Sequence, residues 1–171
     1  ENFDPPQPDD YDIATYYSYD IHGNVKEMWN EMPTLAATDL HYTHLQYSYD
    51  LISGKVNEVV YQPGRSDEFY HRYDYDAANR ITDVWTSRNG LKWERDAEYY
   101  YYLHGPLARM ELGDNKVQGL DYAYTLQGWL KAVNRDLAGK SEDIGVDGTE
   151  YSTQDPNQHS AVAEDAFGFS L

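Results

Sequence analysis

The sequence predicts an all-β fold in which consecutive strands pair antiparallel as a meander. A Tyr-x-Tyr-Asp phrase recurs along the chain and is followed by a glycine or asparagine. Tyrosine accounts for 18 of the 171 residues, and aromatic side chains favour the half-buried surface of a sheet. Tight-turn sequences recur between apolar stretches, and no segment has a convincing helical period.

The repeated phrase has three clear copies and two degenerate ones. Successive glycine positions are 31, 25, 26 and 23 residues apart, within the range that is typical of repeat architectures. A structural unit that repeats without a repeated reactive residue indicates a scaffold. The five copies occupy residues 17–23, 47–54, 73–79, 99–105 and 122–128.

Each copy predicts an incoming strand followed by a tight turn. Two tyrosines at alternate positions place both rings on one face of the strand. The aspartate then caps the turn, because its carboxylate can accept hydrogen bonds from backbone N–H groups two residues on. The glycine supplies a positive φ, which asparagine also tolerates, as in a type I turn with a G1 bulge. The predicted turn residues are Asp20, Gly23, Asp50, Gly54, Asp76, Asn79, Gly105 and Gly128.

An outgoing strand follows each turn and carries apolar residues two and five positions after the glycine position. This spacing places the two side chains on opposite faces of a regular strand, or on one face across a bulge. Outgoing strands return through a second set of turns, such as Asn89-Gly90, so that about ten strands form one meander. The apolar pairs are Val25 and Met28, Val56 and Val59, Ile81 and Val84, Leu107 and Met110, and Leu130 and Val133.

Composition divides the chain into four segments. Residues 1–15 form an acidic, proline-rich leader, and residues 16–135 form the repeat sheet region of about five repeats. Residues 136–160 are predicted to form an acidic loop, and residues 161–171 the start of a further strand, truncated before its partners. An open sheet of ten strands tends to curl, and its edges invite further pairing. We therefore expect an excised section of a larger curved wall.

Charge and composition exclude several classes of partner. The net charge is −17, and affinity for nucleic acid comes mainly from lysine and arginine, so we expect no nucleic-acid partner. The chain has no cysteine, which excludes disulfides and thiolate metal sites. No apolar run approaches 18 residues, so we expect no membrane insertion.

The repeat, Tyr-x-Tyr-Asp-x-x-Gly followed by an apolar pair, resembles the YD repeat of Rhs proteins. The segment 117–131 resembles the Rhs-like proteins of Bacteroidetes in particular, and the likeness covers residues 16–135 with a resumption at 164–168. The resemblance implies a β-hairpin ribbon that spirals into a hollow shell, as in teneurins and insecticidal toxin complexes. In toxin members this shell, or β-cocoon, encloses a C-terminal effector.

The same resemblance implies a location and partners. We expect a secreted or cell-surface protein whose partners are the remaining repeats of the same polypeptide and an encapsulated effector or secretion machinery. Toxin members cleave themselves at an aspartyl-protease-like segment with Asp-Pro motifs near the end of the core. Here Asp155-Pro156 lacks the glycine context of that motif, so the protease role is not carried over.

No residue pattern nominates an enzyme, a metal site or a cofactor. His41 and His44 with Asp39 could suggest a metal cluster, but residues three apart on a strand face opposite sides. The segment 143–148 lacks an oxygen ligand at the third position of a calcium loop. Asp20, Asp50 and Asp76 repeat because each turn needs a cap, so we predict no catalytic residue.

Two functions remain open beside the unsupported enzyme class. The first is a structural, non-catalytic shell segment. The second is surface adhesion or carbohydrate binding, because exposed Tyr and Trp rings stack on sugars or contact proteins. In the first function the tryptophans line the interior or the seams of the shell. The candidate contact residues are Trp29, Trp85, Trp93 and Trp129.

Overall fold

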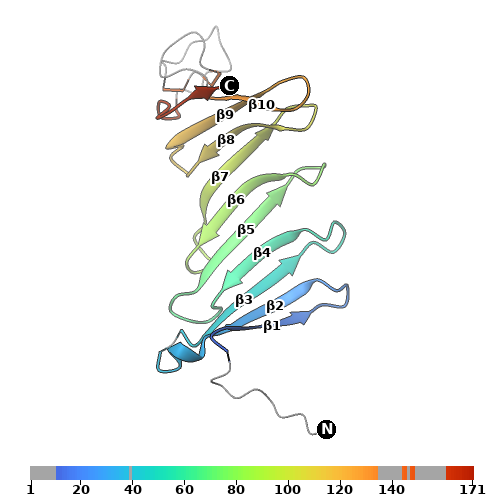
Figure 1. Cartoon of the computed structure of the whole chain (residues 1–171), viewed down its shortest axis with the longest axis vertical. Helices are drawn as coiled ribbons and strands as arrows, with labels where there is room; N and C mark the ends of the chain where they lie inside the picture. Colours follow the sequence, from blue (N-terminus) through green and yellow to red (C-terminus); the bar gives the residue numbers. More distant parts are fainter. Residues whose placement is uncertain (1–10, 39, 135–143, 146, 149–160) are drawn as a thin grey trace. The chain divides into compact units, whose positions relative to one another are not determined.

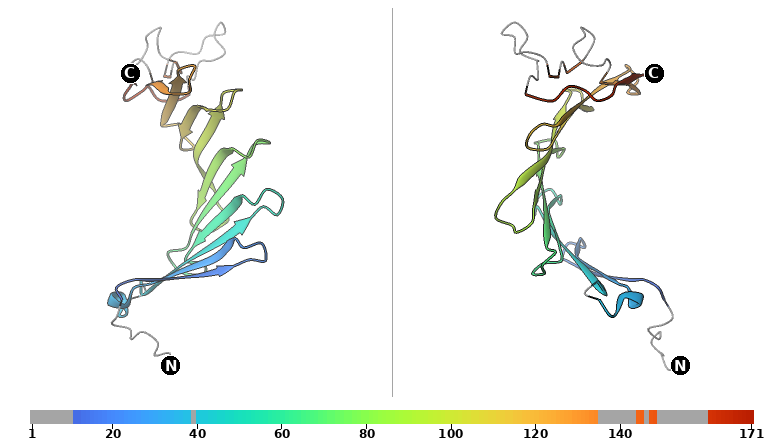
Figure 2. Two further views of the ribbon diagram at one scale, coloured as in Figure 1. Left: turned by 45° about the vertical axis from the view of Figure 1, so that its right-hand side comes forward. Right: turned by 90° about the vertical axis from the view of Figure 1, so that its left-hand side faces the viewer.

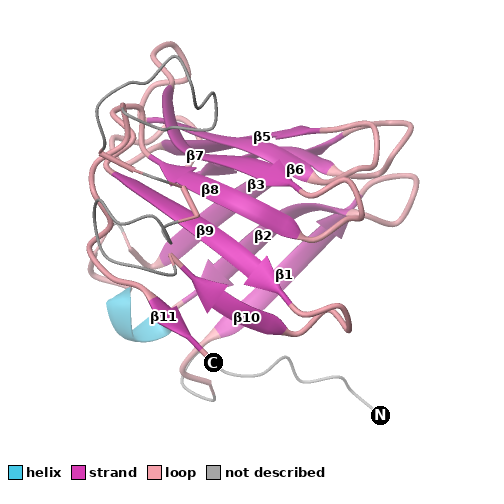
Figure 3. Cartoon of the chain, turned by 90° about the horizontal axis from the view of Figure 1, so that it is seen from above, coloured by secondary structure: helices cyan, strands magenta, loops and turns pink. Residues whose placement is uncertain are grey.

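The computed structural model describes residues 11–38, 40–134, 144–145, 147–148 and 161–171, and it contains eleven strands. They pair in chain order as one antiparallel sheet, so the predicted all-β meander is confirmed (Figure 1). One turn of 3-10 helix, Pro33–Leu35, is drawn in cyan in Figure 3. The strands are β1 Ala14–Tyr19, β2 Val25–Glu31, β3 Tyr42–Tyr49, β4 Val56–Tyr61, β5 Phe69–Tyr75, β6 Ile81–Ser87, β7 Glu94–Tyr101, β8 Leu107–Leu112, β9 Gln118–Tyr124, β10 Leu130–Val133 and β11 Phe169–Ser170.

The chain separates into two compact units. The first comprises Glu1–Arg72 with Ser87–Lys92, and the second comprises Tyr73–Thr86 with Trp93–Leu171. Within the first unit, β1 to β4 lie side by side, which the left view in Figure 2 shows. Within the second unit, β7 to β10 pair in the same antiparallel manner.

The strand register decides where the apolar pair of each outgoing strand lies. Tyr17 stands opposite Met28 and Tyr19 opposite Val25, which leaves Lys26 as an extra, bulged residue. Residues directly opposite each other share a face of the sheet, so Val25 and Met28 lie on the same face. Of the two arrangements that the spacing allowed, the structure has the bulged one.

The same bulge recurs in the later repeats. Asn57 is the extra residue between β3 and β4, and Ala108 is the extra residue between β7 and β8. Each of these repeats therefore places two tyrosines and two apolar side chains together on one face. Because cross-strand pairs contribute roughly 0.2–1 kcal/mol each, such ladders stabilise a sheet collectively.

Fully buried apolar side chains are few in the described part of the chain. A sheet one layer thick cannot enclose a large core, so most of its tyrosines and valines are half-buried. The buried apolar residues are Val60, Ala97, Ala132, Val133 and Val162.

The C-terminal residues differ in part from the prediction. Residues 161–171 were expected to start a strand whose partners are missing, but β11 is a two-residue strand that pairs with β10 (Figure 3). Phe169 stands opposite Val133, and the Leu171 N–H donates to the Lys131 carbonyl at 2.9 Å. The free edge of β10 supplies the partner. Residues 1–10 of the predicted leader and most of the loop 136–160 lie outside the described residues.

Candidate functional site

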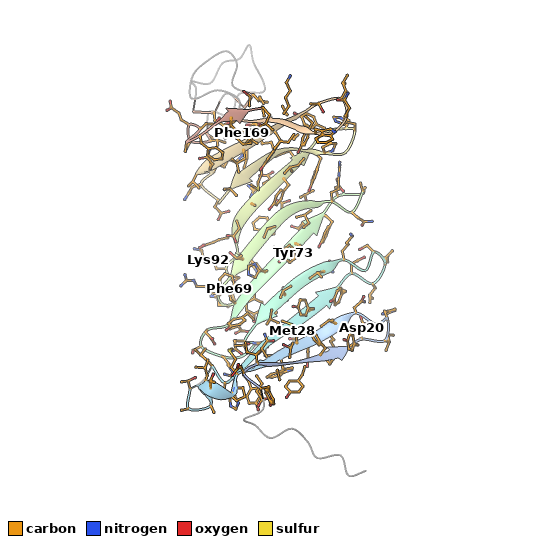
Figure 4. All side chains as sticks on the ribbon, in the orientation of Figure 1. Asp20, Met28, Phe69, Tyr73, Lys92 and Phe169 are labelled. Atoms are coloured by element: carbon orange, nitrogen blue, oxygen red, sulfur yellow. The ribbon has the colours of Figure 1, made fainter. Side chains whose placement is uncertain are left out.

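The repeated aspartates are held inside their turns. Oδ1 of Asp20 accepts hydrogen bonds from the backbone N–H groups of His22 and Asn24, at 2.8 and 2.9 Å. A side-chain hydrogen bond from Asn24 is the largest cause that lowers the pKa of Asp20. Asp20 lies at the turn between β1 and β2, away from Met28 in the middle of β2 (Figure 4). The carboxylate is therefore ionised and engaged in capping.

The other two aspartates follow the same pattern. Oδ1 of Asp50 accepts from the Ser53 N–H at 2.6 Å, and Oδ1 of Asp76 accepts from the Ala78 and Arg80 N–H groups at 2.8 and 2.9 Å. Backbone hydrogen bonds, from Ser53 and from Arg80 respectively, are the largest causes that lower the pKa of both carboxyls. None of the three carboxylates is arranged as an acid/base pair.

The predicted glycine positions all have positive φ. The values are 86° at Gly23, 69° at Gly54, 60° at Asn79, 120° at Gly105 and 84° at Gly128. An L side chain with a Cβ atom is strained in this region, and asparagine tolerates it better than bulky residues do. The turn chemistry of the five repeats thus agrees with the backbone.

Consecutive repeats are joined by a phenol hydrogen bond that sequence reasoning did not predict. The hydroxyl of Tyr49 donates to the Val25 carbonyl at 2.8 Å, and the hydroxyl of Tyr101 donates to the Ile81 carbonyl at 2.7 Å. In both cases the second tyrosine of one repeat reaches the carbonyl two residues past the glycine position of the preceding repeat. We call this contact the phenol bond. Burial raises the pKa of both tyrosines, so both hydroxyls keep their protons at neutral pH.

The fourth and fifth repeats use a variant of this contact. Tyr102 replaces the capping aspartate, and its hydroxyl donates to the Tyr122 carbonyl at 2.8 Å. Its ring packs edge-on against Tyr124 at 6.4 Å, with His104 stacked at 5.3 Å. In the fifth repeat Thr125 replaces the aspartate, and its hydroxyl accepts from the Trp129 N–H at 3.1 Å. A cleft of about 480 Å³ separates these two turns and is lined by Tyr102, His104, Pro106, Ala123, Tyr124, Thr125, Leu126 and Gly128.

The four tryptophans differ in how far they reach solvent. Trp29 is half-buried and stacks on His44 with ring centroids 3.7 Å apart. Trp85 donates its indole N–H to Asp74 at 2.7 Å, and an arginine lies over its ring. Trp93 is half-buried, whereas Trp129 is 75 % exposed. Trp129 is therefore the tryptophan best placed to contact a partner.

A tyrosine cluster surrounds Glu31 at the end of β2. The hydroxyls of Tyr11, Tyr16 and Tyr42 donate to its carboxylate at 3.0, 2.9 and 2.8 Å, and His41 lies 3.4 Å away. Hydrogen bonds from Tyr42 and then Tyr16 lower the pKa of Glu31. This arrangement ties β1, β2 and β3 together and occupies the carboxylate.

The two histidines that were considered as metal ligands, His41 and His44, each contact another side chain. His41 faces Glu31, whereas His44 stacks on Trp29, and Asp39 lies outside the described residues. Among the residues that the structure describes, no group of three or more His, Asp or Glu side chains suits a metal ion.

A buried charge network lies over β8 and β9 in the second unit. The guanidinium of Arg109 donates to Glu111 at 3.0 Å, to Asp147 at 2.6 Å and to Asp121. Lys116 approaches the other oxygen of Glu111 at 2.7 Å. Arg109 and its three carboxylate partners are all buried. We call these five side chains the Arg109 network.

Two glycines let the chain approach this network closely. A Cβ atom on Gly119 would collide with the side chains of Asp147 and Arg109, and one on Gly145 would collide with Asp121 and Arg109. Asn134 extends the polar contacts, because its amide donates to the Gly119 carbonyl at 3.1 Å and to Asp165 at 2.7 Å. The network and these contacts therefore hold Gly145, Asp147 and Asp165 against the sheet.

The electrostatics of the network favour ion pairs over acid/base chemistry. Burial acts to raise the pKa of Glu111, but hydrogen bonds from Lys116 and Arg109 outweigh it, so the pKa is lowered. Burial likewise acts to lower the pKa of Arg109, and the neighbouring carboxylates raise it overall. Arg109 and Glu111 therefore stay charged at neutral pH, and neither is poised to exchange a proton.

Sequence reasoning did not find this network. Asp147 lies in the segment 143–148, which lacks the ligand pattern of a calcium loop, and its partner Arg109 lies 38 residues away. One signal was present: Arg109 and Asp121 each adjoin an apolar residue of a strand, at Met110 and Leu120. Because successive side chains of a strand point to opposite faces, these two charges lie on the face opposite Met110 and Leu120.

Comparison with protein-family models and with curated proteins found no match to this chain. Among the described residues no helix is long and apolar enough to cross a membrane.

Proposed function

We propose that this chain is a structural, non-catalytic segment of the β-shell of a larger Rhs-like protein, secreted or displayed at the cell surface. In this proposal the shell encloses or presents a C-terminal effector, and the partners of the chain are the other repeats of the same polypeptide. The phenol bond carries the proposal, because Tyr49 and Tyr101 tie successive repeats together with the same contact.

The use of the charged side chains supports this function. Asp20, Asp50 and Asp76 are engaged by turn N–H groups, and the carboxylates around Arg109 are ion-paired. The residue at the capping position differs between repeats while the turn is kept, since Tyr102 and Thr125 occupy the position that is aspartate in the first three repeats. A structural segment tolerates such substitutions, whereas an active site requires particular reactive groups.

Protease protection in the intact gene product tests the shell. We expect the region C-terminal to this chain to resist a protease that cleaves the same region rapidly once it is expressed alone. Arg109→Ala is expected to weaken the wall and to expose that region, whereas Lys26→Ala, at an exposed bulge, leaves it protected. Equal digestion of the region inside and outside the intact protein contradicts the proposal.

A second function, carbohydrate binding at a surface, is favoured by one observation. Trp129 is 75 % exposed and adjoins Gly128, which lines the cleft shared with Tyr102, His104 and Tyr124. A flat, amphipathic ring beside an aromatic cleft suits the face of a sugar. In this function the chain is an adhesive module.

Titration of surface polysaccharides against tryptophan fluorescence tests the second function. A saturable change that Trp129→Ala removes and Leu91→Ala retains is the expected result, because Leu91 is exposed in the other unit. Absence of any saturable change with the polysaccharides rejects carbohydrate binding and leaves the shell proposal untouched.

A further inference from the structure

The first and third strands both end in Tyr-Ser-Tyr, and an aspartate of the turn follows each of them. Residues 17–20 and residues 47–50 therefore both read Tyr-Ser-Tyr-Asp. The β3 copy has strands on both sides, β2 and β4, whereas β1 is the first strand in the sheet order. Within the described part of the chain, the β1 copy therefore has one strand neighbour where the β3 copy has two.

The exposed fractions record this difference. Tyr17 and Tyr19 are 51 % and 61 % exposed, whereas their counterparts Tyr47 and Tyr49 are half-buried. In addition, Tyr49 makes the phenol bond to the Val25 carbonyl of β2. Because the tetrapeptides are identical, the neighbour that covers β3 identifies what fits β1.

We propose that the open edge of β1 binds the outgoing strand of a further hairpin of the same repeat type, supplied by the same polypeptide. The carbonyl two residues past the turn glycine of that hairpin accepts the Tyr19 hydroxyl, as Val25 accepts Tyr49. This inference rests on the proposed shell function and names the edge and the side chain that recognise the next repeat. Strand addition of this kind draws affinity from main-chain hydrogen bonds.

The register of the incoming strand follows from β2 and β3. Met28 stands opposite Leu45, and Glu27 stands opposite Gln46. Transferred to the identical residues at the end of β1, the same register puts the methionine position opposite Thr15 and the glutamate position opposite Tyr16. The phenol bond then falls on Tyr19, and an unpaired edge of a sheet offers the N–H and C=O groups that the strand needs.

A peptide that copies residues 22–32 is the direct probe, because this sequence contains β2, the strand that covers β3. The peptide carries a fluorescent label and is titrated into the whole 171-residue chain, with a scrambled peptide of the same composition as control. We expect saturable binding of the copy alone, with NMR shift changes of the backbone amides concentrated at 14–19. Binding no better than that of the scrambled peptide, or shift changes elsewhere, overturns the inference.

Two matched variants isolate the phenol bond. Tyr19→Phe removes the hydroxyl and is expected to weaken peptide binding about two- to tenfold, the range for one neutral hydrogen bond. Tyr17→Phe removes a hydroxyl from the same strand and is expected to leave binding unchanged. Circular dichroism verifies that both variants fold. An equal effect of the two variants contradicts the role of Tyr19.

The remaining outcomes separate this inference from the shell proposal. If the chain dimerises in ultracentrifugation and Tyr19→Phe abolishes the dimer, the occupant is a second copy and the source assigned here is wrong. If the peptide does not bind while the C-terminal region stays protected in the intact protein, the edge inference fails and the shell proposal stands. Peptide binding without protection supports recognition at the β1 edge and contradicts the shell proposal.

Discussion

The hydroxyl of Tyr49 donates to the backbone carbonyl of Val25 across the junction of two repeats, 2.8 Å away. The two residues are one position out of the register of β2 and β3, in which Glu27 faces Gln46. Tyr101 and Ile81 have the same offset between β6 and β7, in which Asp83 faces Glu98. A side chain thus adds a bond to a backbone group beside the regular ladder, and it does so at the same repeat position in each unit.

Tyr49→Phe tests what this bond contributes. Loss of one neutral hydrogen bond lowers the free energy of unfolding by about 1 kcal/mol, provided that the ring stays in place. Tyr47→Phe is the matched control, since its ring lies 6.5 Å from that of Tyr49 on the same strand. Urea denaturation measures both variants. A Tyr47→Phe effect as large as that of Tyr49→Phe contradicts the assignment.

Gly54 isolates the backbone requirement of the turn. Its φ is 69°, and an added Cβ atom would meet nothing within 4 Å, so a substitution acts through the backbone alone. We expect Gly54→Ala to destabilise the protein by about 1–2 kcal/mol. Gly54→Asn should be milder, because Asn79 adopts a φ of 60° at the same position of its repeat. Thermal denaturation ranks the two variants, and the reverse order rejects this explanation.

We expect the capped aspartates to make the protein less stable in acid. Their pKa values are lowered in the folded protein, so their contribution is complete above the ordinary value of 3.8 and is lost as the pH falls below it. We expect the triple variant of Asp20, Asp50 and Asp76 to Asn to flatten the decline in melting temperature between about pH 4 and pH 2. A triple variant that keeps the wild-type slope contradicts the capping role of these carboxylates.

Arg109→Met removes the central cation of a buried network. Glu111, Asp121 and Asp147 then lose the cation that they share, while Glu111 keeps Lys116, and breaking a buried ion pair costs about 3–5 kcal/mol. Without Arg109 the pKa of each carboxyl rises, so protonation relieves the loss and the deficit shrinks as the pH falls toward about 4. Denaturation at neutral pH and at this acidic pH measures the difference. A deficit that grows in acid contradicts the ion-pair description.

The repeats were predictable because their determinants are local. The cap of Asp20 and the positive φ of Gly23 depend on residues within four positions, and sequence spacing reports them directly. The position of the apolar pair was left open, because a bulge is set by how two strands align. The pairing of Val25 with Tyr19 decides which face the apolar pair occupies, and this pairing exists only once both strands have formed.

The contacts that join distant residues escaped prediction. The phenol bond from Tyr49 depends on a carbonyl 24 residues away, and any residue carries such an acceptor. The Arg109 network combines two strands with a segment that sequence alone assigned to a loop. The C-terminal strand was expected to lack partners, since nothing in residues 161–171 reveals that β10 has a free edge.

The phenol bond also determines where the chain tolerates change in length. Ten residues separate β2 from β3 and six separate β6 from β7, yet Tyr49 and Tyr101 find their acceptors at the same offset. Alignment of the strands is thus fixed at the glycine end of each hairpin, and the opposite end is free to lengthen. Insertions of foreign peptide between β2 and β3 should therefore preserve the sheet, which makes that end the natural place to graft new sequence.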